Sequence, residues 1–148
     1  MKKYELTTEC KEFLGRKLYR IKALTFFSDV KEGDLGGWIE KEENLSQEGN
    51  TWVYGNAMVY GNAEIKKKTH LLEIGFIGSR DDVTTFFRTK DEEIFVKCGC
   101  FKGNIDEFEK QVQEVHGDDK HGRVYALAIA MAREQIELDD EDVEEEDD

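Results

Sequence analysis

The chain has 148 residues, a net charge of −13, three cysteines and no proline. This length favours one domain or two small ones, and a hydrophobic content of 39% excludes a wholly disordered chain. No apolar run approaches the roughly 18 residues that a membrane span needs, and the N-terminus lacks the apolar region of a signal peptide. We therefore expect a cytoplasmic protein that makes no contact with membranes.

Residues 1–45 carry apolar positions typical of short strands, with a hairpin turn at Gly15. A tandem repeat follows, in which the six residues W-V-Y-G-N-A at 52–57 are succeeded directly by M-V-Y-G-N-A at 58–63. A period of six with small residues at the corners is typical of a β-solenoid, and two repeats predict only a short stub of one. The inward positions of this stub would be Val53, Val59 and Ile65.

Two tyrosines of the repeat, Tyr54 and Tyr60, flank the inward valines. We expect both to point outward and to form a flat strip suited to an interface. Because one coil leaves an open edge, this strip predicts contact with a second copy of the chain or with a partner protein. The alternative is that aromatic side chains of this region belong to the core.

Residues 69–136 predict three antiparallel strands, at 71–77, 84–89 and 94–98. Two helices follow. The first begins at Asn104, since Glu107 three residues later completes a capping box. The second covers about 120–136, and its expected core positions are Val124, Leu127, Ala128, Met131 and Ile136.

The predicted fold class is therefore α+β. Residues 1–68 would be a β-rich segment with the hexapeptide-repeat, β-solenoid-like stub, and 69–136 would be an α+β module with a three-stranded sheet and two helices. Residues 137–148 would be a disordered acidic tail.

The tail holds ten acidic side chains in twelve positions, and without them the net charge would be −3 rather than −13. Such a block argues against direct binding of nucleic acid and fits a partner that is itself a nucleic-acid binder. The alternative is a solubilising terminus with no target. The candidate partner-binding residues of the tail are Asp139, Asp140, Glu141, Asp142, Glu144, Glu145 and Glu146.

Cysteine and histidine residues near the end of the third predicted strand indicate a structural zinc site. Cys98 and Cys100 would point to one face of the strand, and His116 and His121 would return to it from the end of the first helix. The alternative is that the cysteines are small buried side chains and the histidines lie in a surface loop.

A second candidate site follows the first strand of the module. Gly78, Ser79, Arg80 and Arg88 combine exposed backbone N–H groups, a hydroxyl and guanidinium groups, which suit a phosphate or a carboxylate. The alternative is an ordinary strand connection with solvated polar residues.

The stretches 3–7 and 33–40, together with the tandem repeat, resemble bacteriophage and prophage proteins of the hexapeptide-repeat, or transferase, type. Residues 71–136 resemble a C-terminal module found on some of these proteins. The resemblance implies a phage origin, although the chain holds only two of the repeats that longer members carry.

No nucleophile motif or metalloprotease motif is present, and the repeat contains no histidine, so we predict that the chain is not an enzyme. The tail favours a phage-encoded interaction protein that inhibits a host nucleic-acid-binding defence enzyme, as anti-CRISPR proteins do, by occluding a basic surface. Two alternatives stay open: a counter-defence protein that sequesters a nucleotide or another small ligand, and a vestigial hexapeptide acyltransferase.

Overall fold

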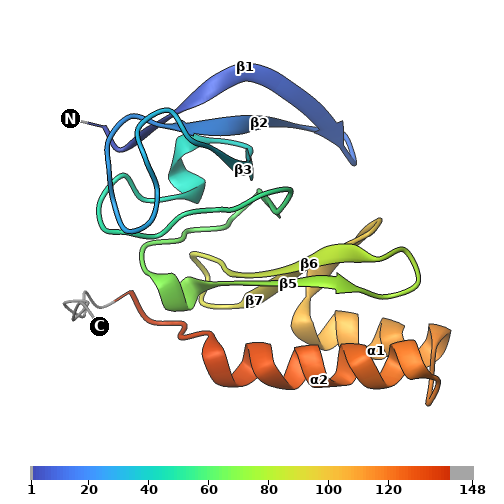
Figure 1. Ribbon diagram of the computed structural model, residues 1–148. Helices are drawn as coiled ribbons and strands as arrows, with labels where there is room; N and C mark the ends of the chain where they lie inside the picture. Colours follow the sequence, from blue (N-terminus) through green and yellow to red (C-terminus); the bar gives the residue numbers. More distant parts are fainter. Residues whose placement is uncertain (1, 141–148) are drawn as a thin grey trace.

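The computed structural model describes residues 2–140, which form two four-stranded sheets and two α-helices. Figure 1 shows three layers: the first sheet, the second sheet beneath it, and the helices on the far side of the second sheet. Within residues 2–140, none of the helices has the length and apolar character needed to cross a bilayer.

The first sheet has the strand order β1-β2-β3-β4. Its long hairpin consists of β1 (Tyr4–Phe13) and β2 (Arg16–Ala23), which are antiparallel. The next strand, β3 (Leu35–Ile39), pairs antiparallel with β2, and the two-residue β4 (Met58–Val59) pairs parallel with β3. A short 3₁₀ helix, η1 (Glu42–Asn44), lies between β3 and β4.

The tandem repeat turns its small apolar residues inward as expected, because Val53, Val59 and Ile65 are fully buried. Its two glycines, Gly55 and Gly61, adopt positive φ angles of +56° and +63° at the turns. The predicted solenoid stub is nevertheless wrong. The second repeat supplies only β4 to a mixed sheet, because two repeats are too few to bury each other and the β1–β2 hairpin and β3 cover them instead.

The second sheet is antiparallel, with the order β5-β6-β7-β8. The four strands of this sheet are β5 (Leu71–Ile77), β6 (Asp82–Arg88), β7 (Ile94–Cys98) and β8 (Phe101–Asn104). A 3₁₀ helix, η2 (Lys68–His70), directly precedes β5. The predicted three-stranded sheet is therefore wrong, and with eight strands in two sheets the chain is mostly β rather than α+β in the predicted form. At four residues, β8 is too short to show an alternating pattern between its turn and the helix that follows.

Helix α1 (Ile105–Val115) begins where the sequence predicts, because Asn104 Oδ1 accepts a hydrogen bond from Glu107 N at 2.9 Å and Glu107 Oε1 accepts one from Asn104 N at 3.0 Å. The extent of α2 (Lys120–Gln135) is also confirmed. Its predicted core face is wrong in part, since Leu127 and Met131 are 71% and 54% exposed. The buried positions of α2 are Gly122, Tyr125, Ala128, Ile129 and Ala132.

Strand alternation divides the interior into two cores. One face of the second sheet packs on α1 and α2 through side chains such as Phe86 and Val96. The opposite face contributes Phe87 and Phe95 to the core of the first sheet. The second sheet is thus covered on both faces, and polar side chains on either face lie in a protein interior.

Candidate functional site

A cleft of about 680 Å³ lies at one end of the second sheet. Figure 1 shows the β5–β6 loop and the α1–α2 connection at this same end of the molecule. We call it the helix-end cleft, and its polar lining includes Ser79, Arg80, Asp82, Cys98, Lys102 and His116. Apolar side chains of Ile77, Phe101 and Val115 also line it. Cys100 also lines the cleft. Residues of the predicted ligand site, Ser79 and Arg80, therefore share one cleft with three of the predicted zinc ligands.

The β5–β6 loop can reach the cleft because of a glycine. Gly78 has a φ angle of +84°, and a Cβ at this position would collide with the hydroxyl group of Tyr125 on α2. A glycine is therefore required both by the backbone conformation and by the close approach of the helix. This approach places the adjacent Ser79 and Arg80 on the rim of the helix-end cleft.

The thiol of Cys98 is held between two hydroxyl groups. Cys98 Sγ lies 3.5 Å from the hydroxyl oxygen of Tyr125 and 3.5 Å from Thr84 Oγ1. Burial, above all, raises the pKa of the Tyr125 phenol above its ordinary value, so the phenol stays protonated at neutral pH. The inner wall of the cleft is therefore a neutral hydrogen-bonding surface.

His116 follows α1 and is oriented by its neighbours. Its ring lies 5.7 Å from that of Tyr125 and 5.6 Å from that of His121, centroid to centroid. Its Nδ1 is 3.4 Å from Asp119 Oδ2. Asp119 caps α2 by accepting a hydrogen bond from Gly122 N at 2.8 Å, and this bond, more than the contact with His116, lowers the pKa of the Asp119 carboxyl group.

The predicted zinc ligands lie near one another without forming a metal-binding group. Cys98 ends β7, and Gly99 with a φ angle of +57° turns the chain before Cys100, so the two cysteines do not share one strand face as expected. Across residues 2–140, no three His, Cys, Asp or Glu side chains are arranged to hold one metal ion. Zinc binding by Cys98, Cys100, His116 and His121 stays a prediction.

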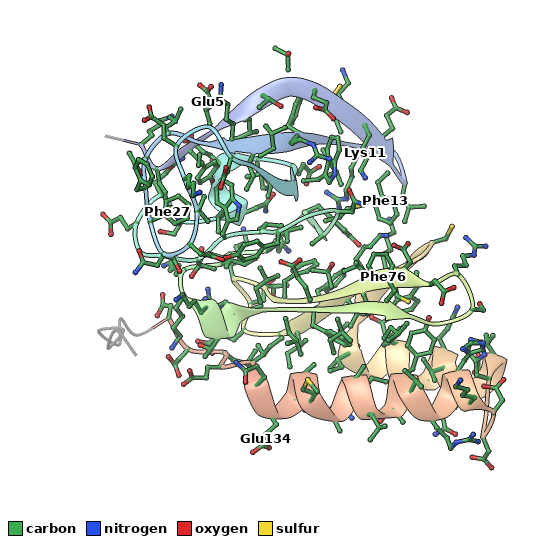
Figure 2. All side chains as sticks on the ribbon, in the orientation of Figure 1. Glu5, Lys11, Phe13, Phe27, Phe76 and Glu134 are labelled. Atoms are coloured by element: carbon green, nitrogen blue, oxygen red, sulfur yellow. The ribbon has the colours of Figure 1, made fainter. Side chains whose placement is uncertain are left out.

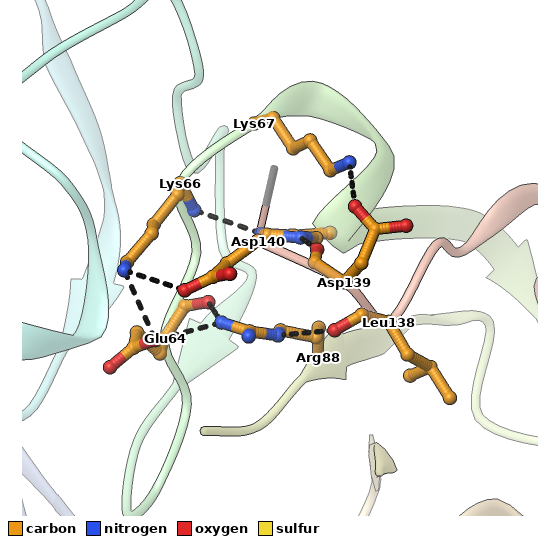
Figure 3. Close-up of polar contacts among 8 residues, drawn as sticks. Glu64, Lys66, Lys67, Arg88, Leu138, Asp139 and Asp140 are labelled. Atoms are coloured by element: carbon orange, nitrogen blue, oxygen red, sulfur yellow. Dashed lines mark hydrogen bonds and ion pairs between the residues drawn. The ribbon is translucent and has the colours of Figure 1, made fainter. Parts of the chain in front are cut away.

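Arg88 lies apart from the rest of its predicted ligand site. It is 2% exposed, and its guanidinium donates hydrogen bonds to Leu138 O at 3.0 Å and to Glu64 Oε1 at 2.9 Å (Figure 3). The cause is strand direction: β6 starts beside the β5–β6 loop and carries Arg88 to the opposite end of the sheet. The structure thus brings Ser79 and Arg80 together and leaves Arg88 with a structural role.

The first residues of the acidic tail contact the segment that joins the two sheets. Asp139 forms an ion pair with Lys67 at 2.8 Å, and Asp140 forms one with Lys66 at 3.2 Å (Figure 3). The fully buried His70 accepts a hydrogen bond from Lys66 N at its Nδ1, and its Nε2 lies 2.6 Å from Asp139 O. Among the predicted partner-binding acids, Glu141, Asp142, Glu144, Glu145 and Glu146 lie outside the described residues.

The two repeat tyrosines differ in position, contrary to the expectation that both point outward. Tyr54 is 46% exposed, and its hydroxyl donates a hydrogen bond to Asp29 Oδ1 at 2.7 Å. Tyr60 is 2% exposed and packs edge-on against Phe87 of the second sheet. Burial raises the pKa of Tyr60 to about 12.

Sequence reasoning missed Tyr125, which links the β5–β6 loop to Cys98. A signal was present, because positions 125, 128, 129, 132 and 136 follow the spacing of a buried helical face. The predicted core face, which includes Leu127 and Met131, is a neighbouring face of the same helix.

No known protein-family profile matches the chain. A stretch of 62 residues is 44% identical to a protein of Escherichia coli (strain K12) named uncharacterized acetyltransferase YdcK. The match covers 36% of this chain and 19% of the relative, so it spans about a fifth of that protein's length.

This partial likeness agrees with the resemblance to the transferase type of hexapeptide-repeat proteins. It also contradicts the prediction that the chain is not an enzyme, because the relative carries the name of an enzyme class. The phage origin stays a prediction.

Proposed function

We propose that this chain binds a small phosphate-bearing molecule with an apolar or aromatic part, of the nucleotide class, in the helix-end cleft. The observation that carries the proposal is the chemistry of the lining: two cationic side chains, Arg80 and Lys102, and the imidazole ring of His116 stand beside a single acidic side chain, Asp82. This excess of hydrogen-bond donors suits an anion in a protein whose overall charge is −13.

The size and floor of the cleft support the same class of ligand. Sites for small molecules commonly occupy roughly 300–1,000 Å³ and combine an apolar lining with a few polar groups. The helix-end cleft, at about 680 Å³, presents Phe101 and Ile77 beside the hydroxyl groups of Ser79 and Tyr125. A base or acyl chain would contact the apolar side chains while phosphate groups face Arg80.

The partial likeness to a protein named as an acetyltransferase favours one member of this class, a coenzyme A thioester. Such a thioester is itself a nucleotide derivative, because it carries an adenosine phosphate as well as an acyl group. Free nucleotides and acyl thioesters would therefore present the same phosphate chemistry to Arg80 and Lys102.

Isothermal titration calorimetry with ATP, a cyclic dinucleotide and acetyl-coenzyme A tests the proposal. We expect at least one of them to bind, and Arg80→Met to weaken that binding at least tenfold, because an anion loses a charge-assisted hydrogen bond. Arg133→Met is the matched control, since Arg133 lies near the C-terminal end of α2 and pairs with Asp106 at 2.8 Å. Binding that is absent for all three compounds, or equal in both variants, rejects this assignment.

Inhibition of a host nucleic-acid-binding defence enzyme stays a prediction. Asp139 and Asp140 are engaged by Lys67 and Lys66, so the acidic groups offered to a partner would come mainly from residues 141–148. Co-purification with host proteins, with and without residues 141–148, tests it: two identical sets of partners would remove this segment from the mechanism.

A further inference from the structure

Three cationic side chains gather between the two sheets, on the face of the second sheet opposite the helices. We call them the inter-sheet cations: Lys11 of β1, Arg20 of β2 and Lys97 of β7. Lys11 Nζ and the Arg20 guanidinium lie 4.3 and 4.5 Å from the ring of Trp38. Lys97 Nζ lies 5.2 Å from the ring of Phe13, and Figure 2 shows Lys11 and Phe13 between β1 and the second sheet.

These cations are poorly compensated by acidic groups. Lys97 is 6% exposed, yet no carboxylate within residues 2–140 forms an ion pair with it or with Lys11. Arg20 lies 3.4 Å from Glu9, whose side chain is 58% exposed. A buried ammonium group without a counter-charge is costly, and the aromatic faces offset only part of that cost.

Hydrogen-bonding groups without partners lie beside the same cations. Within the described part of the chain, Trp38 Nε1 and Thr85 Oγ1 are buried and make no hydrogen bond, whereas the Nε of Arg20 is the atom that pairs with Glu9 at 3.4 Å. Thr85 is directly opposite Lys97 in the β6–β7 register, so its side chain lies on the same face. Native proteins satisfy nearly all such groups, which indicates that an acceptor belongs here.

The electrostatics of Lys11 agree with this arrangement. Its pKa is lowered first by burial and then by the positive charges of Lys97 and Arg20, and Asp82 acts in the opposite direction. A dianion placed among the inter-sheet cations would relieve this repulsion and accept hydrogen bonds from the unpartnered donors.

We propose that the inter-sheet cations bind a phosphate group, with Lys11 and Lys97 supplying charge and Trp38 Nε1–H and the Thr85 hydroxyl supplying hydrogen bonds. Lys97 and Cys98 are consecutive in β7 and therefore point to opposite faces of the sheet, so the proposed site lies away from the inner wall of the helix-end cleft. Lys102 of that cleft is opposite Lys97 in the β7–β8 register, so the two sites approach each other at the rim. Lys11 is half-buried and gives the site its access to solvent.

Thermal unfolding of the full chain in sodium phosphate and in sodium chloride of equal ionic strength tests the proposal. Phosphate stabilises many proteins by exclusion from their surface, so the measured quantity is the difference in this effect between variants. We expect wild type to gain about 3 °C more in Tm than Lys97→Met at a phosphate concentration tenfold above the Kd. In chloride, Lys97→Met should melt no lower than wild type, since a methionine removes an uncompensated buried charge at similar volume.

Three further variants keep the outcome unambiguous. Arg133→Met, which removes a surface ion pair with Asp106, should retain the full phosphate effect. Lys11→Gln should lose the effect even if Lys97→Met fails to fold, and Arg80→Met reports separately on phosphate bound in the helix-end cleft. Equal phosphate effects in wild type, Lys97→Met and Lys11→Gln would overturn the proposal. Loss of the effect in Arg80→Met alone would also overturn it and would assign the phosphate to the helix-end cleft.

Discussion

Replacing Arg88 with methionine should destabilise the protein more than any change to its exposed arginines. Arg88 is 2% exposed, and its guanidinium connects three parts of the chain: its own strand β6, Glu64 before the second sheet, and Leu138 after α2. Methionine fills most of the same volume. The substitution therefore tests the hydrogen bonds and the charge rather than the packing.

The expected magnitude follows from these partners. Removing one member of a buried ion pair costs about 3–5 kcal/mol, because the other charge is left without compensation. The Glu64 side chain is 33% exposed and water can rehydrate it, so we expect Arg88→Met to lower the free energy of unfolding by about 2–4 kcal/mol. For a chain of this length, that loss corresponds to a fall in Tm of roughly 5–12 °C.

Urea denaturation followed by tryptophan fluorescence measures this loss, since Trp38 and Trp52 are both buried in the first core. Arg133→Met is the control, because Arg133 forms its ion pairs with Asp106 and Glu109 at the surface, where such pairs contribute about 0–1 kcal/mol. If Arg88→Met and Arg133→Met differ by less than 1 kcal/mol, the assigned structural role of Arg88 is wrong.

Three other predictions concern buried groups. Burial raises the pKa of Glu73 to about 7, so the stability of the wild type should fall as pH rises from about 5 to 8. Glu73→Gln should show no such fall and should be more stable than wild type at pH 8 by up to about 3 kcal/mol. If urea denaturation gives the same pH dependence for both proteins, this prediction is wrong. Burial lowers the pKa of His70, so the folded protein holds this ring in its neutral form. In the Glu73→Gln background, the free energy of unfolding should therefore decrease as pH falls through about 6.5, because the unfolded chain takes up the proton more readily. His70→Gln should remove that decrease. Gly78→Ala should lower the free energy of unfolding by about 2–3 kcal/mol and Gly99→Ala by only about 1 kcal/mol. Both glycines have positive φ angles, but only Gly78 lies against Tyr125. Equal losses in denaturant titrations would argue against that contact.

Local signals in the sequence predicted local structure well. The capping box at Asn104 located the start of α1, and β6 and β7 pair antiparallel close to the strands predicted at 84–89 and 94–98. The inward positions Val53, Val59 and Ile65 were also predicted correctly, because a six-residue period fixes them without reference to the rest of the chain.

Features decided by distant parts of the chain could not be predicted in the same way. Tyr54 and Tyr60 occupy identical positions in the repeat, and only the presence of Phe87 and Phe13 over the second repeat buries Tyr60. The face of α2 was misassigned because two overlapping helical faces are compatible with the spacing of its apolar residues, and the sheet contacts the face of Tyr125 and Ile129 rather than that of Leu127.

The candidate site was predicted in parts and not as a whole. Arg80 and His116 were singled out for two different ligands, and their common cleft depends on the contact between Gly78 and Tyr125, which are far apart in the sequence. Arg88 was grouped with Arg80 because the two are near in sequence. A strand of seven residues separates them in space.

The contacts of Arg88 have a consequence for the order in which the chain can complete its fold during synthesis. Its partner Glu64 precedes it by 24 residues, whereas Leu138 follows it by 50 residues. At typical translation rates, those 50 residues take roughly 3–10 s to make. During that interval the first sheet and the β6–β7 hairpin can already form, while the Arg88 guanidinium still lacks the carbonyl group that completes its hydrogen bonds. The junction between the two sheets is therefore closed by a peptide group that is made 50 residues after Arg88 itself.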